Sequence, residues 1–324
     1  ATQPKGGILN KWIQERGSFS STTSASFSAD FAIGAVDGAA EKEAVTAAYG
    51  FQIDLSTSFT GEDSFDVAID AGTGGSGTLA ELDLNDTEDA LVVDGISYTF
   101  PIGDKLTVFA GDSTDGSTLY STACVYGGVT DTLDSCGSAS SALESSGYAN
   151  IAAGASYDIG NGFTAALGYT GNGSSGIMTK EGDDSFGGQI SYTADSYGAS
   201  VTYANVEDST MSDATYWGLN GYWTPEGFPS ISVGFEAGNP DSGADTTQWF
   251  VGVNGEIGPG TLGAAVGTKG AITEGQTEEL MYEAYYSYPI NDGMTITPLV
   301  YVKENSTAEA DNETGIMVKT SFSF

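Results

Sequence analysis

The feature that most constrains this chain is an alternation of apolar and polar side chains, with a period of two residues, that recurs along most of its length. A clear example is the run of apolar or aromatic residues at Val45, Ala47, Tyr49, Phe51, Ile53 and Leu55. Successive side chains of a β-strand point to opposite faces of a sheet, so this pattern predicts strands with one apolar and one polar face. Sixteen such strands are expected, and the segment 313–324 is the last of them.

The connections between the expected strands alternate between short and long. Short turns are expected at 60–63, 101–104, 160–162, 194–196, 224–229, 258–260 and 289–293. Longer polar loops are expected at 37–43, 72–90, 112–147, 171–185, 207–213, 238–245, 270–277 and 304–311. An even number of antiparallel strands, with short turns at one end and longer loops at the other, is typical of bacterial outer-membrane barrels. The sequence therefore predicts an all-β fold, a closed antiparallel transmembrane β-barrel of sixteen strands over residues 19–324.

A secreted tandem of β-sandwiches is the main alternative, but it explains neither the segregation of loop lengths nor the position of the aromatic residues. Tyr and Trp gather near strand ends, at Tyr98, Tyr157, Tyr192, Tyr197, Tyr222, Trp223, Tyr286 and Tyr288. Each ring alone fits an ordinary cross-strand pair. Together, close to the short turns, they predict an aromatic girdle at the level of lipid headgroups.

One strand departs from the alternation. Continuing the apolar face of Ile96 and Tyr98 backwards would point the carboxylate of Asp94 towards lipid. A bulge that contains a glycine re-aims its neighbours, so we expect a bulge at Asp94–Gly95, with an interface between protomers as the alternative.

The two ends of the chain carry further expectations. The final strand ends on Phe324, which resembles the C-terminal signal of outer-membrane barrels. Ala1 is not preceded by a basic start and an apolar run, so we expect any signal peptide to have been removed. Residues 1–18, with Leu9, Trp12 and Ile13 at helical spacing, are expected to form a linker or a short helix.

Charge and composition narrow the function. The chain has 44 acidic and 9 basic residues, a formal net charge of −35, which excludes nucleic-acid binding through phosphate neutralisation and favours cations. It contains no histidine, which removes Ser-His-Asp, Cys-His and His-metal sites. Asp66 and Asp70 are interpreted as pore-lining residues rather than as an acid/base pair. No enzyme activity, cofactor or metal site is predicted.

The polar faces of the strands, together with the long loop 112–147, are expected to line a pore. The residues expected to line it and to set its selectivity are Asp54, Asp66, Asp70, Asp112, Asp115, Asp131, Asp134, Glu236, Glu256, Glu283, Lys269, Lys303 and Lys319. Acids outnumber bases among them. The prediction is a passive, weakly cation-preferring diffusion channel for small hydrophilic solutes and inorganic ions. The alternative is a structural barrel, a tether or surface receptor, whose lumen the long loop closes.

Two loops carry separate predictions. The loop 112–147 is the natural candidate to fold inward and narrow the pore, and the alternative is an outer cap. Its Cys124 and Cys136 are expected to form a local disulfide, with free thiols as the alternative. The acidic run 83–89 is interpreted as a solvated outer loop rather than as a Ca²⁺ site, because it lacks the glycine of an EF-hand loop.

Four segments resemble the porins of cyanobacteria, often labelled iron uptake porins and related to the carbohydrate-selective porins. They are ISYTFPIGDKLTVFAG at 96–111, FSSTT at 19–23, LSTSFTGE at 55–62 and YSYPINDGMTITPLVYV at 286–302. The resemblance implies a homotrimer in the cell outer membrane, in contact with lipid and lipopolysaccharide, that passes small inorganic ions. In that family, an upstream domain, absent from this sequence, binds peptidoglycan. The acidic, glycine-rich composition resembles the marine picocyanobacterial members.

Overall fold

The computed structural model describes residues 22–38, 44–74, 77–137, 150–174, 176–179, 182–207, 212–306 and 311–324. The expected linker or helix at 1–18 lies outside this range. The two helices of the described part are the 3-10 turn η1 (Gly77–Leu79) and α2 (Asp131–Asp134). No helix among these residues is long and apolar enough to cross a membrane.

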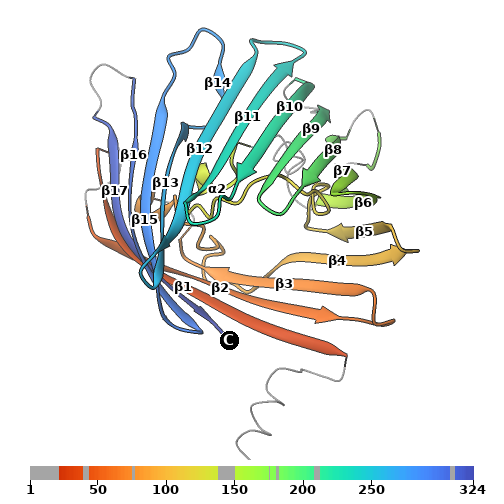
Figure 1. The fold of residues 1–324 in the computed structure, drawn as a ribbon, viewed down its shortest axis with the longest axis horizontal. Helices are drawn as coiled ribbons and strands as arrows, with labels where there is room; N and C mark the ends of the chain where they lie inside the picture. The colour runs from red at the N-terminus through yellow and green to blue at the C-terminus, as the bar shows by residue number, and fades with distance from the viewer. Residues whose placement is uncertain are drawn as a thin grey trace, which may run out of the picture.

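The fold is a single antiparallel sheet that closes on itself (Figure 1). Its strands are β1 (Thr23–Asp37), β2 (Thr46–Thr57), β3 (Ser64–Gly72), β4 (Val92–Ile102), β5 (Leu106–Asp112), β6 (Asn150–Gly160), β7 (Phe163–Asn172), β8 (Asp184–Thr193), β9 (Tyr197–Glu207), β10 (Ala214–Trp223), β11 (Ser230–Pro240), β12 (Thr246–Ile257), β13 (Gly260–Thr268), β14 (Ile272–Thr273), β15 (Leu280–Asn291), β16 (Met294–Lys303) and β17 (Glu313–Ser323). The two-residue β14 only extends the pairing of β12, while β13 pairs directly with β15. The wall is therefore a closed barrel of 16 strands, as predicted.

The first and last strands close the barrel. β1 and β17 pair in antiparallel register from Ser28 opposite Ser323 to Asp37 opposite Thr314. Beyond this register, the backbones of Phe27 and Phe324 exchange two hydrogen bonds of 2.9 and 3.0 Å, and their rings stack 5.7 Å apart. The chain therefore enters and leaves the barrel at the end that carries the short turns.

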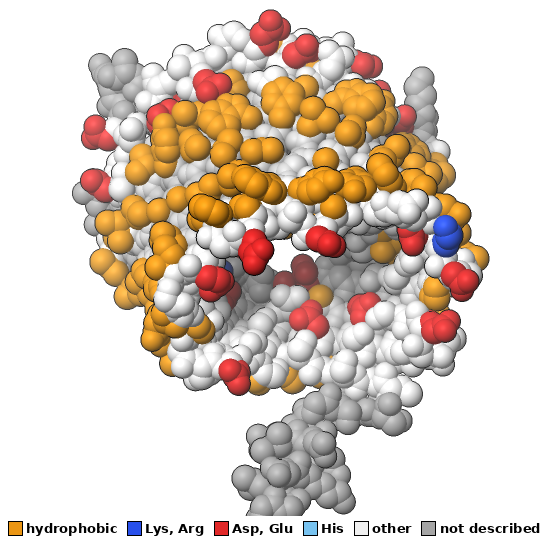
Figure 2. Space-filling view, in the orientation of Figure 1, with side chains coloured by type: hydrophobic (Ala, Val, Ile, Leu, Met, Phe, Trp, Pro, Cys, Tyr) orange, Lys and Arg blue, Asp and Glu red, His pale blue; other side chains and the backbone are white. Residues whose placement is uncertain are grey.

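The predicted alternation separates an apolar outer face from an inner face that is polar except at a buried apolar patch that includes Met281 and Tyr301. Phe31, Leu167 and Ile316 expose 55%, 69% and 65% of their surface on the outside. Figure 2 shows hydrophobic side chains gathered in bands over the outer wall and acidic side chains around a hollowed interior. An exposed apolar band of this extent needs an apolar solvent or a partner surface to cover it.

The aromatic residues near the short turns mostly point outward. Tyr157, Tyr197, Trp223 and Tyr288 are 46%, 50%, 54% and 40% exposed. Tyr222 differs from the expectation: its ring lies against Gly198, where an added Cβ would approach a ring atom to 2.4 Å. Because Tyr222 alternates with the outward Trp223, its ring belongs to the inner face.

The bulge predicted at Asp94–Gly95 is confirmed. Ala68 of β3 lies opposite Gly95 of β4, but the next residue, Ile69, lies opposite Val93. Asp94 is therefore the extra residue of the bulge. It interacts electrostatically with Asp54, which places its charge on the inner side of the wall.

Candidate functional site: the barrel interior

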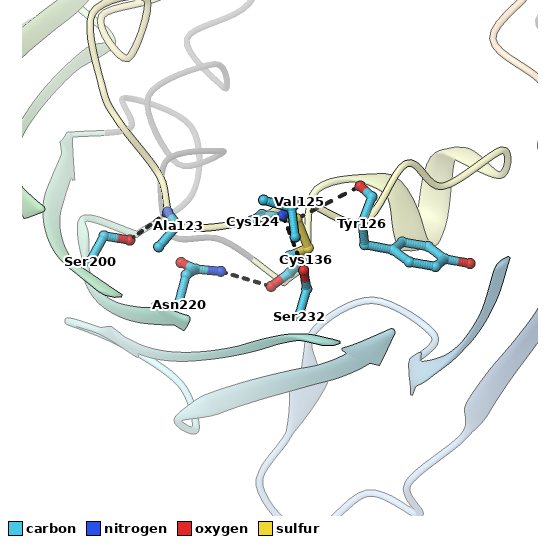
Figure 3. Close-up of a disulfide and its surroundings, with 8 residues drawn as sticks. All are labelled: Ala123, Cys124, Val125, Tyr126, Cys136, Ser200, Asn220 and Ser232. Carbon is cyan, nitrogen blue, oxygen red and sulfur yellow. Dashed lines mark hydrogen bonds between the residues drawn. A yellow bond between two sulfur atoms is a disulfide. The ribbon is translucent and has the colours of Figure 1, made fainter. Parts of the chain in front are cut away.

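The long loop after β5 folds into the barrel instead of capping it. Backbone N–H groups of Gly116, Ala123 and Val125 donate hydrogen bonds of 2.6, 3.0 and 3.0 Å to wall hydroxyls. These hydroxyls belong to Thr170 on β7, Ser200 on β9 and Ser232 on β11. Figure 3 shows the loop running over β9–β11 at two of these contacts. The described part of the loop thus runs through the interior, with these three backbone N–H groups satisfied by the wall.

A buried carboxylate on β15 anchors the middle of this loop. Glu283 is 3% exposed, and it accepts hydrogen bonds of 2.6 Å from the Tyr126 hydroxyl and 2.7 Å from the Thr130 N–H. Charge-assisted hydrogen bonds of this kind are stronger than neutral ones. Glu283 was predicted to line the pore. Its oxygens accept the hydrogen bonds of the loop.

Cys124 and Cys136 form a disulfide that fixes the shape of the loop (Figure 3). Their Cα atoms are 6.2 Å apart, and α2 lies between them in the chain. The carbonyl of Cys136 accepts a hydrogen bond of 2.9 Å from Asn220 on β10. An added Cβ at Gly234 of β11 would lie 1.6 Å from that carbonyl oxygen, so only glycine permits the loop to approach the wall this closely.

The described part of a second loop, 73–91, also packs into the interior through its leucines, although Asp83, Asp86 and Glu88 of the acidic run 83–89 stay exposed, as expected of a solvated run. Leu79, Leu82 and Leu84 are 3%, 0% and 0% exposed. They belong to a buried apolar cluster with inner-face residues such as Met281 and Tyr301, and with Leu133 of the long loop. Burying a leucine side chain contributes about 1.5–3 kcal/mol, which holds both loops against the wall.

The two loops meet at Glu81. Its carbonyl accepts a 3.0 Å hydrogen bond from the N–H of Asp131, at the start of α2. Its carboxylate forms an ion pair with Lys303 of β16. Both side chains of this pair are largely buried, with 9% and 15% exposure. The ion pair therefore locks the junction of the loops to the wall.

Unpaired carboxylates gather where the loops face β2–β4. Asp70 interacts electrostatically with Asp54, Asp83 and Asp94. Asp83 also acts on Asp131 and Asp134 of α2. The second loop therefore places Asp83 between the carboxylates of the wall and those of the long loop, in the narrowed part of the lumen.

The acids of α2 titrate above their ordinary range. Burial, and then the charges of Asp131 and Asp83, raises the pKa of Asp134 to about 6. Burial and the carboxylate of Glu81 raise the pKa of Asp131. Both side chains reach solvent inside the barrel, yet the surrounding wall restricts their hydration. Crowded negative charge is thus a property of this constriction.

Three of the four lysines in the described part lie close to a carboxylate of their own. Lys303 pairs with Glu81, Lys319 lies 3.7 Å from Asp30, and Lys269 lies 3.1 Å from Glu279. Lys105 belongs to the turn before β5. Lys303 also acts on Asp131, but within the described ranges no lysine acts on Asp70, Asp94 or Asp134.

The other predicted pore residues are spread along the barrel. Asp66 accepts a hydrogen bond from Ser64 on its own strand. Asp112 and Asp115 accept hydrogen bonds from backbone N–H groups at the start of the long loop. Glu236 is 5% exposed, and its carboxylate is hydrogen-bonded to the side chain of Gln248 on β12. Glu256 is exposed near a short turn, where Thr261 donates to it at 2.9 Å. These residues do not share the constriction.

Asp83, Asp94 and Glu81 were not among the residues predicted from the sequence to line the pore. A signal for the first was present, since Asp83 lies between Leu82 and Leu84 in an alternating run. Such a run indicates one face that packs and one that meets water. No group of three or more His, Cys, Asp or Glu side chains in the described part is arranged to coordinate a metal ion directly.

No protein-family profile matches the sequence, and no curated protein is significantly similar to it. Solved structures do match. OprB of Pseudomonas putida has 12% sequence identity and a TM-score of 0.70, over 98% of this chain and 97% of the other. Its fold is that of the bacterial porins. A mutant of the porin of Rhodopseudomonas blastica also matches, with 17% identity and a TM-score of 0.61 over 93% of this chain and all of the other. At these identities the likeness shows the porin fold alone.

Proposed function

We propose that this protein is a passive diffusion channel of the bacterial outer membrane that admits small hydrophilic solutes and inorganic ions and prefers cations. The observation that carries the proposal is the interior narrowed by two loops, where Asp83 faces Asp70, Asp94 and Asp134 and no described lysine acts on these three carboxylates. An apolar outer band and a polar lumen are the two surfaces that a transmembrane barrel needs. Sixteen strands enclose an aqueous bore rather than a packed core.

The sign of the selectivity follows from charge. At an effective dielectric constant near 20, two unit charges about 4 Å apart interact by about 4 kcal/mol. Water and salt screen exposed carboxylates, so each contributes much less than this to the interaction with a passing ion. The contributions of several carboxylates nevertheless add, because their charges have the same sign. Anions are therefore repelled from the constriction, and cations are concentrated there. Uncharged small solutes are limited by size alone.

The test is a planar-bilayer recording of the purified protein in a KCl gradient. We expect discrete conductance steps and a reversal potential displaced towards that of K⁺. Absence of steps would contradict the channel, whereas a reversal potential displaced towards that of Cl⁻ would contradict the selectivity.

A structural barrel, a tether or surface receptor with a closed lumen, is the second candidate. It is favoured by the apolar packing of both loops into the interior, around Leu82 and Leu133. Reduction of the Cys124–Cys136 disulfide discriminates between the two, because a channel should change its conductance or its current noise when this loop loosens. A closed barrel should stay silent in both states.

The resemblance of residues 96–111 and 286–302 to cyanobacterial porins supports a finer assignment. On that basis we place the protein in the outer membrane of a cyanobacterium, as a homotrimer in contact with lipid and lipopolysaccharide. Chemical cross-linking in mild detergent, followed by denaturing electrophoresis, tests the assembly. A ladder that ends at three chains is expected. A ladder that ends at one chain would exclude the trimer.

A further inference from the structure

Four carboxylates form a cluster on one side of the lumen. Asp54, Asp70 and Asp94 come from the neighbouring strands β2, β3 and β4, and Asp83 comes from the second loop. Asp70 interacts with the other three, and Asp94 interacts with Asp54 and Asp83. These four residues, the carboxylate cluster, therefore concentrate negative charge in one region of the ion path.

Asp70 is the member that points to a ligand. It is 7% exposed, and its Oδ1 accepts no hydrogen bond from any residue that the structure describes. A buried carboxylate oxygen without a partner costs free energy, and such a group in a folded protein calls for an ion or water to satisfy it. The side chain lies within the cluster, so its partner must come from the lumen.

The chain itself supplies no such partner among the described residues. Lys303 is held by Glu81, Lys319 lies 3.7 Å from Asp30, and no described lysine acts on Asp70 or Asp94. Within the cluster, Asp54 does have a partner: its Oδ1 accepts a hydrogen bond of 2.8 Å from the Gln52 amide. That neutral donor does not compensate the charge.

We propose that the carboxylate cluster binds a divalent cation of the Mg²⁺ type together with its water shell, within the pore. The described carboxylates are too widely spaced for three of them to coordinate one ion directly. Mg²⁺ dehydrates reluctantly and keeps several waters in protein sites. Its bound waters are hydrogen-bond donors, which match the acceptor oxygens of Asp70 and Asp83. The inference rests on the proposed channel function, since the ion reaches the site through the lumen.

Single-channel recording in dilute KCl with increasing MgCl₂ tests the site. We expect the K⁺ current to fall saturably, with half of the effect on the order of 1 mM, the range of weak carboxylate sites. Asp70→Asn and Asp83→Asn should each raise the half-effect concentration several-fold. Asp104→Asn, which removes an exposed carboxylate in the turn before β5, is the matched control and should behave as the unaltered protein. An Mg²⁺ effect that is equal in all four proteins would overturn the proposal.

Hexaamminecobalt(III) tests whether the ion keeps its shell, because its ammonia ligands do not exchange. We expect it to reduce the current in the unaltered protein, and less so in Asp83→Asn. A reduction by Mg²⁺ without one by hexaamminecobalt would indicate direct coordination and would overturn binding through the water shell.

Calorimetric titration of the detergent-solubilised protein with MgCl₂ keeps the two proposals separate. Binding that weakens in Asp70→Asn supports the site even if no conductance is seen, in which case the channel proposal alone fails. Conductance with cation preference, but without Mg²⁺ binding, would leave the channel proposal intact and overturn the site. Heat-dependent electrophoretic mobility confirms that each variant is folded.

Discussion

Asp134 makes the selectivity of the constriction depend on pH. Its pKa is raised to about 6, so the carboxylate is charged above that pH and becomes neutral as the pH falls through it. Cation preference should therefore decline between about pH 7.5 and about pH 5, well above the ordinary range of an aspartate. Asp134→Asn should lower the preference at the higher pH and flatten this decline. Reversal potentials in a KCl gradient measure both, and an unchanged pH profile in the variant would exclude Asp134 as the titrating group.

Asp63 stabilises a short turn through a network of hydrogen bonds. Its Oδ1 accepts from the N–H groups of Phe59 and Thr60 at 2.9 and 2.8 Å, and its Oδ2 accepts 2.6 Å from the Tyr98 hydroxyl. This network, chiefly the bond from Tyr98, lowers the pKa of Asp63 well below its ordinary value. The stabilisation is therefore complete above the ordinary aspartate pKa near 4 and is lost only in strong acid.

Asp63→Asn should lower the thermal stability of the barrel, because an amide retains one acceptor oxygen and loses the charge. We expect the midpoint of heat-dependent mobility in electrophoresis to fall by a few degrees at neutral pH. Glu62→Gln, at an exposed neighbouring position, is the control. Equal midpoints for the two variants would show that the network contributes nothing.

At the scale of elements, the position of the long loop depends on Glu283. Removing its carboxylate with Glu283→Ala leaves the Thr130 N–H and the Tyr126 hydroxyl without their acceptor, at a cost of about 1–3 kcal/mol for each buried group. The loop should detach from β15, so the single-channel conductance should rise or fluctuate. Glu256→Ala, near a short turn, should leave it unchanged. A Glu283→Ala channel with steady, unaltered conductance would show that other contacts suffice to hold the loop.

At the scale of the whole molecule, the excess of acidic residues predicts selectivity that depends on salt. The Debye length shortens from about 10 Å at 0.1 M to about 3 Å at 1 M ionic strength, so charges on the lumen wall are screened from a passing ion. Cation preference measured at a constant KCl ratio should therefore weaken steeply as the mean concentration rises. Preference that is independent of salt would indicate size exclusion rather than charge.

The sequence determined the wall of this barrel, for a local reason. Side chains alternate along any β-strand, so Phe31, Ile33 and their counterparts mark the outer face wherever the strand lies. The short turns, the long loops, the even strand count and the bulge at Asp94–Gly95 follow from residues close together in the chain. The alternation that continues to Phe324 also indicated that the last strand pairs with the first.

Only the tertiary structure decided what occupies the lumen, because those contacts join distant parts of the chain. Glu81 and Lys303 are separated by 222 residues, and Tyr126 and Glu283 by 157. The alternation of Leu82, Asp83 and Leu84 indicates one face that packs, but it does not show that this face packs inside the barrel, so Asp83 was not assigned to the pore. Apolar packing across the barrel, rather than the polarity of the segment, carries this acidic loop inside.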